Sequence, residues 1–182
     1  MPEGSAVIVP ITLPTRLAVL RDAGDRLAAG GVPAHVTVLF PFLASEALTP
    51  SVRSALARLA ARNPPFVARF SRVERREEMV WLVPADQRPF LDLTLAAAAL
   101  WPDHPPYGGV HDRLIAHLTL VETTDRGARD AAWAAALEIG PFEVAVRELT
   151  VITESASGGW RTRWRLPISD RTARAPSATG TT

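Results

Sequence analysis

The sequence predicts an α+β domain in which one order of strands and helices occurs twice. Three observations indicate this fold class: a globular composition, segments that switch between strand and helix periodicity, and a repeated phrase. The phrase His-Val-Thr-Val at residues 35–38 returns as His-Leu-Thr-Leu at residues 117–120, which is 82 positions later (117 − 35 = 82). For a chain of 182 residues we expect one domain of two lobes over residues 1–168.

Each half of the chain follows the order strand, helix, His-containing strand, helix, strand. β-branched runs indicate the strands, and apolar residues at helical spacing indicate the helices. Thr49-Pro50 and Asp125 are signals for helix starts, while Gly30-Gly31 and Gly140 are signals for helix ends. The expected ranges are 6–13, 15–29, 34–40, 50–62 and 66–73 in the first half, and 79–83, 89–100, 114–121, 126–138 and 142–153 in the second.

A last strand is expected over residues 160–166, paired as a hairpin with residues 142–153. Its faces are expected to carry Trp160, Thr162, Trp164 and Leu166 on one side and Arg161, Arg163 and Arg165 on the other. The apolar faces of the predicted elements place Trp81, Trp133 and Trp164 in the core. Residues 169–182 have no periodicity, so we expect a disordered tail there.

The composition excludes several classes of site. The chain has no Cys, which excludes disulfides, thiolate metal sites and cysteine nucleophiles. All 20 basic residues are Arg, which excludes a ligase that forms a lysine–AMP adduct. The net charge of +1 gives no general attraction to nucleic acid or membranes. Because the first residues do not resemble a secretory signal, we expect a cytoplasmic protein without a membrane partner.

Each copy of the repeated phrase places an imidazole and a hydroxyl on one face of a strand. Side chains at i and i+2 share a face, which pairs His35 with Thr37 and His117 with Thr119. A neutral imidazole can accept a proton while a second, protonated one donates, which makes these residues candidates for phosphoryl chemistry. The alternative is two structural pairs whose polar groups are satisfied by the backbone.

The two phrases, their separation and the duplicated order of elements resemble the two-histidine (2H) phosphoesterase superfamily. The local sequence is also similar to its bacterial 2′-5′ RNA ligase-like branch, at His-Val-Thr-Val-Leu-Phe-Pro-Phe (residues 35–42) and Pro-Tyr-Gly-Gly (residues 106–109). By element order the resemblance covers residues 5–168. It implies two pseudo-symmetric lobes of antiparallel sheet that flank a central cleft, with helices on the outside.

The resemblance also implies a site and an activity. It implies that His35, Thr37, His117 and Thr119 are catalytic, in a metal-independent and cofactor-free phosphodiesterase that opens 2′,3′-cyclic phosphates of RNA ends or nucleotides. It favours His117 as base and His35 as acid, although the residues themselves leave both assignments open. The alternatives are a nucleotide- or RNA-binding module without turnover and an ATP-independent, reversible 2′-5′ RNA ligase. We expect a monomer.

Four further residues are candidates for substrate binding. Tyr107 and Phe42 could stack on a base, although an aromatic ring beside Pro also commonly pins a loop to the core. Arg161 and Arg163 could grip phosphates, or they could form the solvent face of an edge strand.

A zinc site is the metal arrangement that the histidines suggest. It would combine His104, His111 and His117 with Asp103 or Asp112. These residues lack the helical spacing of a zinc-binding HExxH motif, so we expect no metal.

Overall fold

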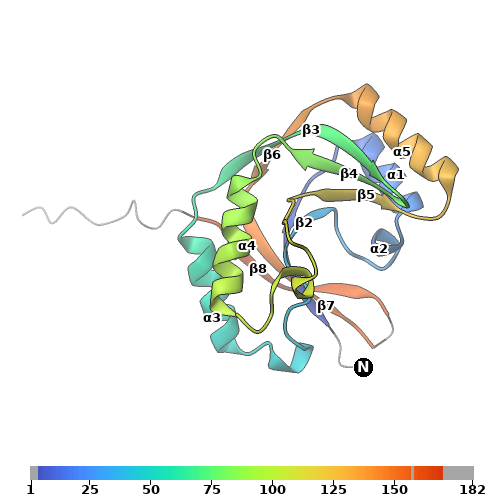
Figure 1. Ribbon diagram of the computed structural model, residues 1–182. Coiled ribbons are helices and arrows are strands. Elements are labelled where there is room, and N and C mark those ends of the chain that lie inside the picture. Colours follow the sequence, from blue (N-terminus) through green and yellow to red (C-terminus); the bar gives the residue numbers. More distant parts are fainter. Residues whose placement is uncertain (1–3, 157, 170–182) are drawn as a thin grey trace, which may run out of the picture.

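The computed structural model describes residues 4–156 and 158–169, and it confirms the predicted α+β fold class (Figure 1). Within these residues, eight strands form one curled antiparallel sheet in the order β6-β3-β4-β5-β2-β1-β7-β8. The strands are β1 (Ser5–Pro10), β2 (His35–Leu39), β3 (Phe66–Arg76), β4 (Met79–Pro84), β5 (Leu118–Glu122), β6 (Phe142–Val146), β7 (Glu148–Glu154) and β8 (Trp160–Pro167). The predicted tail lies outside the described residues except for Ser169.

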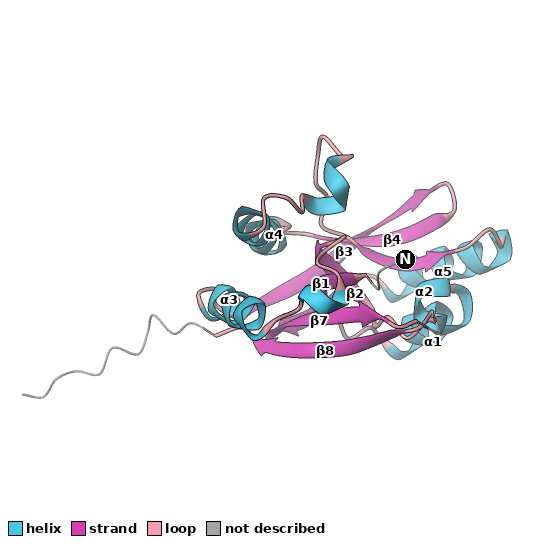
Figure 2. Ribbon diagram, turned by 90° about the horizontal axis from the view of Figure 1, so that it is seen from below, coloured by secondary structure: helices cyan, strands magenta, loops and turns pink. Residues whose placement is uncertain are grey.

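The helices lie in two groups outside the sheet (Figures 1 and 2). They are α1 (Thr15–Gly24), α2 (Arg26–Ala29), α3 (Pro50–Ala61), α4 (Arg88–Leu100) and α5 (Arg126–Ile139), with two short 3-10 turns, Ser45–Ala47 and Pro106–Gly109. α1 and α5 pack on each other and on β5, whereas α4 packs on β2 and α3 packs on β8. None of the described helices is long and apolar enough to cross a membrane.

The two halves of the sheet are not the two halves of the sequence. β3, from the first half of the chain, pairs with β4 of the second half, and β7, from the second half, pairs with β1 of the first half. The strands at the end of each sequence half therefore join the part of the sheet that the other half begins. This exchange explains why the predicted strand over residues 142–153 is wrong as one element. Its first part, β6, pairs with β3, and its second part, β7, pairs with β1, with Arg147 between them.

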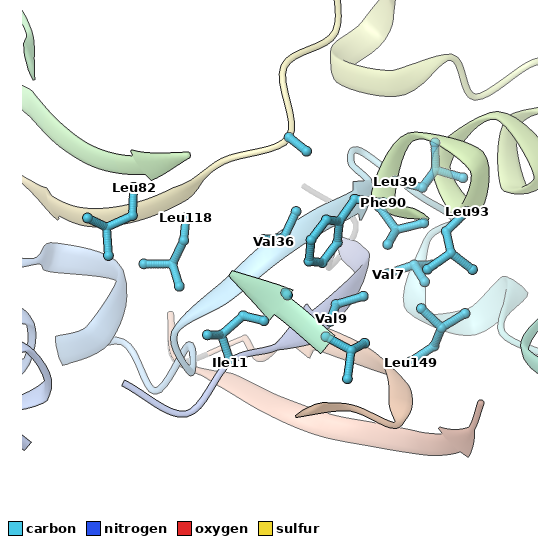
Figure 3. Packing of buried hydrophobic residues seen from close by; sticks show 14 of the residues in the cluster. Val7, Val9, Ile11, Val36, Leu39, Leu82, Phe90, Leu93, Leu118 and Leu149 are labelled. Atoms are coloured by element: carbon cyan, nitrogen blue, oxygen red, sulfur yellow. The ribbon is translucent and has the colours of Figure 1, made fainter. Parts of the chain in front are cut away.

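The sheet halves meet at β2 and β5 through a single bridging pair, Val36 opposite Leu118. Both side chains are buried in the main core, where Phe90 and Leu93 of α4 also lie (Figure 3). Because side chains alternate along a strand, the motif residues next to Val36 and Leu118 face the other side of the sheet, away from this core.

The predicted helix ends are confirmed at two helices. The Thr49 hydroxyl accepts a hydrogen bond from the Val52 amide at the start of α3. The Asp125 carboxylate accepts two amides in the first turn of α5, and Gly140 ends that helix with a φ of 70°. These signals are local, which is why the sequence carries them.

The helix predicted over residues 15–29 is broken at Asp25, which has extended backbone angles. Its carboxylate turns into the protein and accepts hydrogen bonds from the amides of Ala28 (3.0 Å) and Glu122 (3.1 Å). Glu122 belongs to β5, so the break depends on a tertiary contact that helical periodicity does not reveal.

The predicted alternation of β8 is also wrong, because the strand contains a β-bulge. Val151 pairs with Trp164 while Ile152 pairs with Thr162, which leaves Arg163 as the extra residue. Side chains before and after the bulge therefore change faces: Trp160 and Thr162 share a face with Arg165, and Arg161 shares the other face with Trp164 and Leu166.

Candidate active site

The register of β2 and β5 brings the two motifs together. Val36 and Leu118 are opposite each other in an antiparallel pair. Continuing that register by one residue on each side sets the His of each motif against the Thr of the other. The two motifs are thereby related by an approximate two-fold axis through the centre of the sheet.

The motif side chains line one cavity of about 660 Å³, which is within the usual size of a small-molecule site. His35, Thr37, His117 and Thr119 are all partly exposed and all line it. Among the predicted substrate-binding residues, Tyr107 lines the same cavity. The curled sheet therefore presents both imidazoles and both hydroxyls to a single bound molecule.

Each imidazole is held by a hydrogen bond to the backbone carbonyl two residues earlier in the chain. Nδ1 of His35 lies 2.8 Å from the Pro33 carbonyl oxygen, and Nδ1 of His117 lies 2.8 Å from the Ile115 carbonyl oxygen. A carbonyl oxygen can only accept, so Nδ1 carries the proton and donates in both rings. Nε2 is then the nitrogen of each ring that remains available to exchange a proton with a ligand.

The surroundings of His35 disfavour the protonated form of its imidazole. Burial is the main cause that lowers its pKa to about 4, and the positive charges of Arg21 and of His117 act in the same direction. The hydrogen bond to Pro33 opposes them only in part. The His35 imidazole is consequently neutral at pH 7, the state that accepts a proton.

His117 has different neighbours. Its ring packs against Trp81, with ring centroids 4.1 Å apart. Burial is the main cause that lowers the pKa of His117, and the neighbouring His111 acts in the same direction, while the hydrogen bond to Ile115 and the negative charge of Glu74 oppose this shift in part. Glu74 is held in place because it accepts a hydrogen bond from Trp81 Nε1 at 3.2 Å.

Tyr107 reaches the cavity from a strained turn. Tyr107 and Gly108 both have positive φ angles, 53° and 65°, and the Tyr107 amide donates to the Phe40 carbonyl at 2.5 Å. The Tyr107 hydroxyl forms a hydrogen bond with Thr37, while burial raises the pKa of this phenol. The turn thus connects the chain before His117 to the first motif.

One side of the cavity is apolar and aromatic. Phe40 and Trp160 line it with their ring centroids 6.4 Å apart, in an edge-to-face arrangement. Trp160 packs against a small second core of Ala6, Ile8, Val32 and Ile152. Phe40 remains 41% exposed, so a flat apolar group could still cover it.

Three candidate substrate-binding residues take the alternative positions considered for them, and one predicted core residue lines the cavity instead. Phe42 is 5% exposed and packs against Trp101 in the core, so it does not line the cavity. Arg161 and Arg163 are exposed on β8, the edge strand of the sheet, and they are also outside the cavity lining. Trp81, predicted as a core residue, is only half-buried and lines the cavity beside His117.

The predicted core positions of Trp133 and Trp164 are confirmed, since both pack against the main cluster. Of the histidines considered for zinc, His104 lies apart and packs against Phe42, while His111 packs against Tyr107 and lines the cavity together with His117. Among the described residues, no group of three or more His, Asp or Glu side chains is placed to hold a metal ion.

Two charged residues near the site are missing from the sequence prediction. Arg21 lines the cavity although it is only 3% exposed, and it pairs with Asp25, which is 2% exposed. The available signal was spacing: Leu17, Arg21 and Asp25 follow one another at intervals of four, which places two charges on the apolar stripe of a predicted helix.

Comparison with known proteins gives the family. The sequence model of the 2′-5′ RNA ligase superfamily matches residues 9–158. A search of curated proteins found no match.

Among solved structures, the chain is similar to Escherichia coli LigT in apo form, with a TM-score of 0.59, 20% identity and coverage of 93% of this chain and 99% of that one. For LigT complexed with 3′-AMP the TM-score is 0.59 and the identity is 20%, with coverage of 93% of this chain and 100% of that one. For the protein TT0787 of Thermus thermophilus the TM-score is 0.58 and the identity is 18%, with coverage of 92% of this chain and 99% of that one. At these identities the likeness shows the fold alone. Since the family match spans most of the 182 residues, the chain belongs to the 2′-5′ RNA ligase superfamily, the two-histidine phosphoesterases, which act on phosphodiester bonds.

Proposed function

We propose that this protein is a phosphodiesterase that opens 2′,3′-cyclic phosphates of RNA ends or small nucleotides. The observation that carries the proposal is the matched anchoring of His35 and His117 within one cavity. Both rings keep Nε2 for a ligand, and a threonine hydroxyl lies beside each ring. Membership of the superfamily supports chemistry at a phosphodiester bond.

The proposed reaction adds one water molecule and needs two proton transfers. One imidazole takes a proton from water as the water oxygen forms a bond to phosphorus. The bond between phosphorus and one ribose oxygen breaks, and the second, protonated imidazole gives that oxygen a proton. Thr37 and Thr119 donate hydrogen bonds to the non-bridging oxygens as their charge changes. The product is a ribose phosphomonoester.

The aromatic side of the cavity supports a nucleoside as the group that carries the phosphate. Phe40 and Trp160 offer flat apolar surfaces near the first motif, and Trp81 offers another beside His117. Stacking on such rings is tolerant of base identity. One similar structure is LigT complexed with 3′-AMP. That molecule is a ribose 3′-phosphate, which belongs to the product class expected here.

The decisive experiment incubates the purified chain, with a chelator present, with the four 2′,3′-cyclic mononucleotides and an oligonucleotide that ends in a cyclic phosphate. We expect consumption of at least one substrate, a single phosphate isomer as product, and one ¹⁸O atom in that phosphate when the reaction runs in ¹⁸O-water. Tight binding of a nucleotide without turnover of any substrate would instead favour a binding module. Products longer than the substrate, formed with a 5′-hydroxyl RNA, would favour the ligase.

A further inference from the structure

A buried ion pair lies beside the motifs and belongs to neither. Arg21 Nη2 is 3.2 Å from Asp25 Oδ2, and the two side chains are 4% and 0% exposed. Charged side chains are rarely buried this completely, because they lose their hydration. Burial lowers the pKa of Arg21 and raises the pKa of Asp25, in line with this loss. The cost of burying both charges must be offset by the contacts that surround the pair.

The contacts of the pair lead to both motif strands. Arg21 Nη1 donates to the Val32 carbonyl at 2.9 Å, and the next residue, Pro33, supplies the carbonyl that holds His35. Asp25 Oδ1 accepts the Glu122 amide at 3.1 Å, at the end of β5. One ion pair thereby fixes the chain just before the first motif and the end of the strand that carries the second.

The junction between these strands needs such a connection. β2 and β5 share only the bridging pair Val36–Leu118, whereas their outer neighbours are joined by longer ladders. With so few backbone hydrogen bonds between them, the distance between the two motifs is weakly fixed by the sheet itself. Displacements of about 1 Å in a catalytic constellation can cost on the order of 100-fold in rate.

Arg21 also touches the site itself. It lines the cavity together with His35, and its Nε is buried without a hydrogen-bond partner among the described residues. The charged groups that act on His35 are Arg21 on α1 and His117, the residue immediately before β5.

We propose that Arg21 and Asp25 are positioning residues, which hold the two histidine motifs at the separation that phosphoryl chemistry requires. The inference rests on the proposed catalytic roles of His35 and His117. It predicts that the pair matters for turnover more than for substrate affinity, because the ion pair sets the geometry of the reacting groups.

The test replaces the pair by apolar residues of similar volume, Arg21→Met with Asp25→Leu. Buried ion pairs replaced in this way often leave proteins folded. The matched control is Arg16→Met with Glu138→Leu, which removes an exposed ion pair of 2.7 Å between α1 and α5. With 2′,3′-cyclic AMP as substrate, we expect kcat to fall at least about 10-fold in the buried-pair variant with KM changed less than about threefold. The control should keep the wild-type values.

A second measurement does not depend on turnover. NMR titration of the imidazoles should show a higher pKa for His35 in the buried-pair variant, since a repelling positive charge is lost, and an unchanged pKa in the control. If the wild-type protein opens no cyclic phosphate, the proposed function fails, while this titration still decides whether the pair acts on His35.

A folded buried-pair variant with wild-type kcat and an unmoved His35 titration would overturn the inference. If this variant does not fold, Asp25→Asn decides, because an amide keeps the shape but loses one of the two acceptor oxygens. A selective loss of kcat in Asp25→Asn supports the inference. Failure of both variants to fold would also overturn it, since the pair would then be a requirement of the fold and not of the site.

Discussion

The two histidine motifs are built alike by the backbone but differ in what surrounds them. Each ring donates from Nδ1 to the carbonyl two residues earlier, at the same distance of 2.8 Å. Arg21 and His117 both disfavour the protonated form of His35, whereas His117 lies between His111, which disfavours its protonated form, and the carboxylate Glu74, which favours it. The same peptide geometry therefore holds two imidazoles whose pKa values are both lowered, that of His35 to about 4, but by different neighbouring groups.

This difference bears on which histidine acts as the base and which as the acid. The pKa values of both rings are lowered, but Arg21 beside His35 adds to this effect, which suits a base, whereas Glu74 near His117 opposes it in part, which suits an acid. This difference leads to the hypothesis that His35 is the base and His117 the acid, the reverse of the assignment that the family resemblance implies. Four predictions test the comparison, in order of decreasing effect.

The largest effect is expected from removal of either imidazole. His35→Ala and His117→Ala should each lower kcat/KM for a 2′,3′-cyclic nucleotide by about 10²- to 10⁴-fold, because each removes one proton transfer. His104→Ala is the matched control, since this ring packs against Phe42 outside the cavity lining. Wild-type turnover in either motif variant would exclude the paired mechanism.

Removal of a threonine hydroxyl should lower kcat/KM less than removal of an imidazole. A hydrogen bond to a charged group is worth about 1.5–3 kcal/mol, so Thr37→Val and Thr119→Val should each lower kcat/KM about 10- to 150-fold. Tyr107→Phe should reproduce part of the Thr37 effect, because it removes the hydrogen bond to that hydroxyl. Thr124→Val, at an exposed bend, should leave the steady-state kinetics unchanged. Equal losses in all four variants would contradict the assignment.

Glu74→Gln should lower the pKa of His117 and leave that of His35 in place, because a nearby negative charge favours the imidazolium. NMR titration measures both rings, with Glu143→Gln as control for an exposed carboxylate. In the pH profile of kcat/KM, the alkaline limb reports the acid and the acidic limb reports the base. A shift of the alkaline limb alone supports His117 as acid, whereas a shift of the acidic limb would make His117 the base.

The smallest effect concerns acid stability. The pKa of His35 is about 4 in the folded protein and about 6.5 in an unfolded chain. Between about pH 6.5 and about pH 4 the unfolded chain binds more protons at this residue, so lowering the pH favours unfolding. The unfolding temperature should therefore fall as the pH is lowered from about 6.5 to about 4. His35→Gln should flatten this dependence more than His117→Gln does. An unchanged slope in His35→Gln would contradict the low pKa of His35.

Local signals explain which parts of the fold the sequence predicts well. The Thr49 cap, the Asp125 cap and the Gly140 stop act within a few residues, and the structure contains all three. The faces of the β2 and β5 motifs follow from alternation, which is why four residues far apart in the sequence could be placed in one site. The bulge at Arg163 and the break at Asp25 depend on partners elsewhere in the fold, so periodicity misses them.

The sequence by itself determined the two motifs, the face that each presents and the order of elements, because these depend on neighbouring residues in the chain. The tertiary structure alone decided the strand exchange, the move of Trp81 from core to cavity, and the burial of Arg21 against Asp25. These features depend on which strands pair and which charges lose water. That information exists only once segments about a hundred residues apart are in contact, as Asp25 and Glu122 are (122 − 25 = 97).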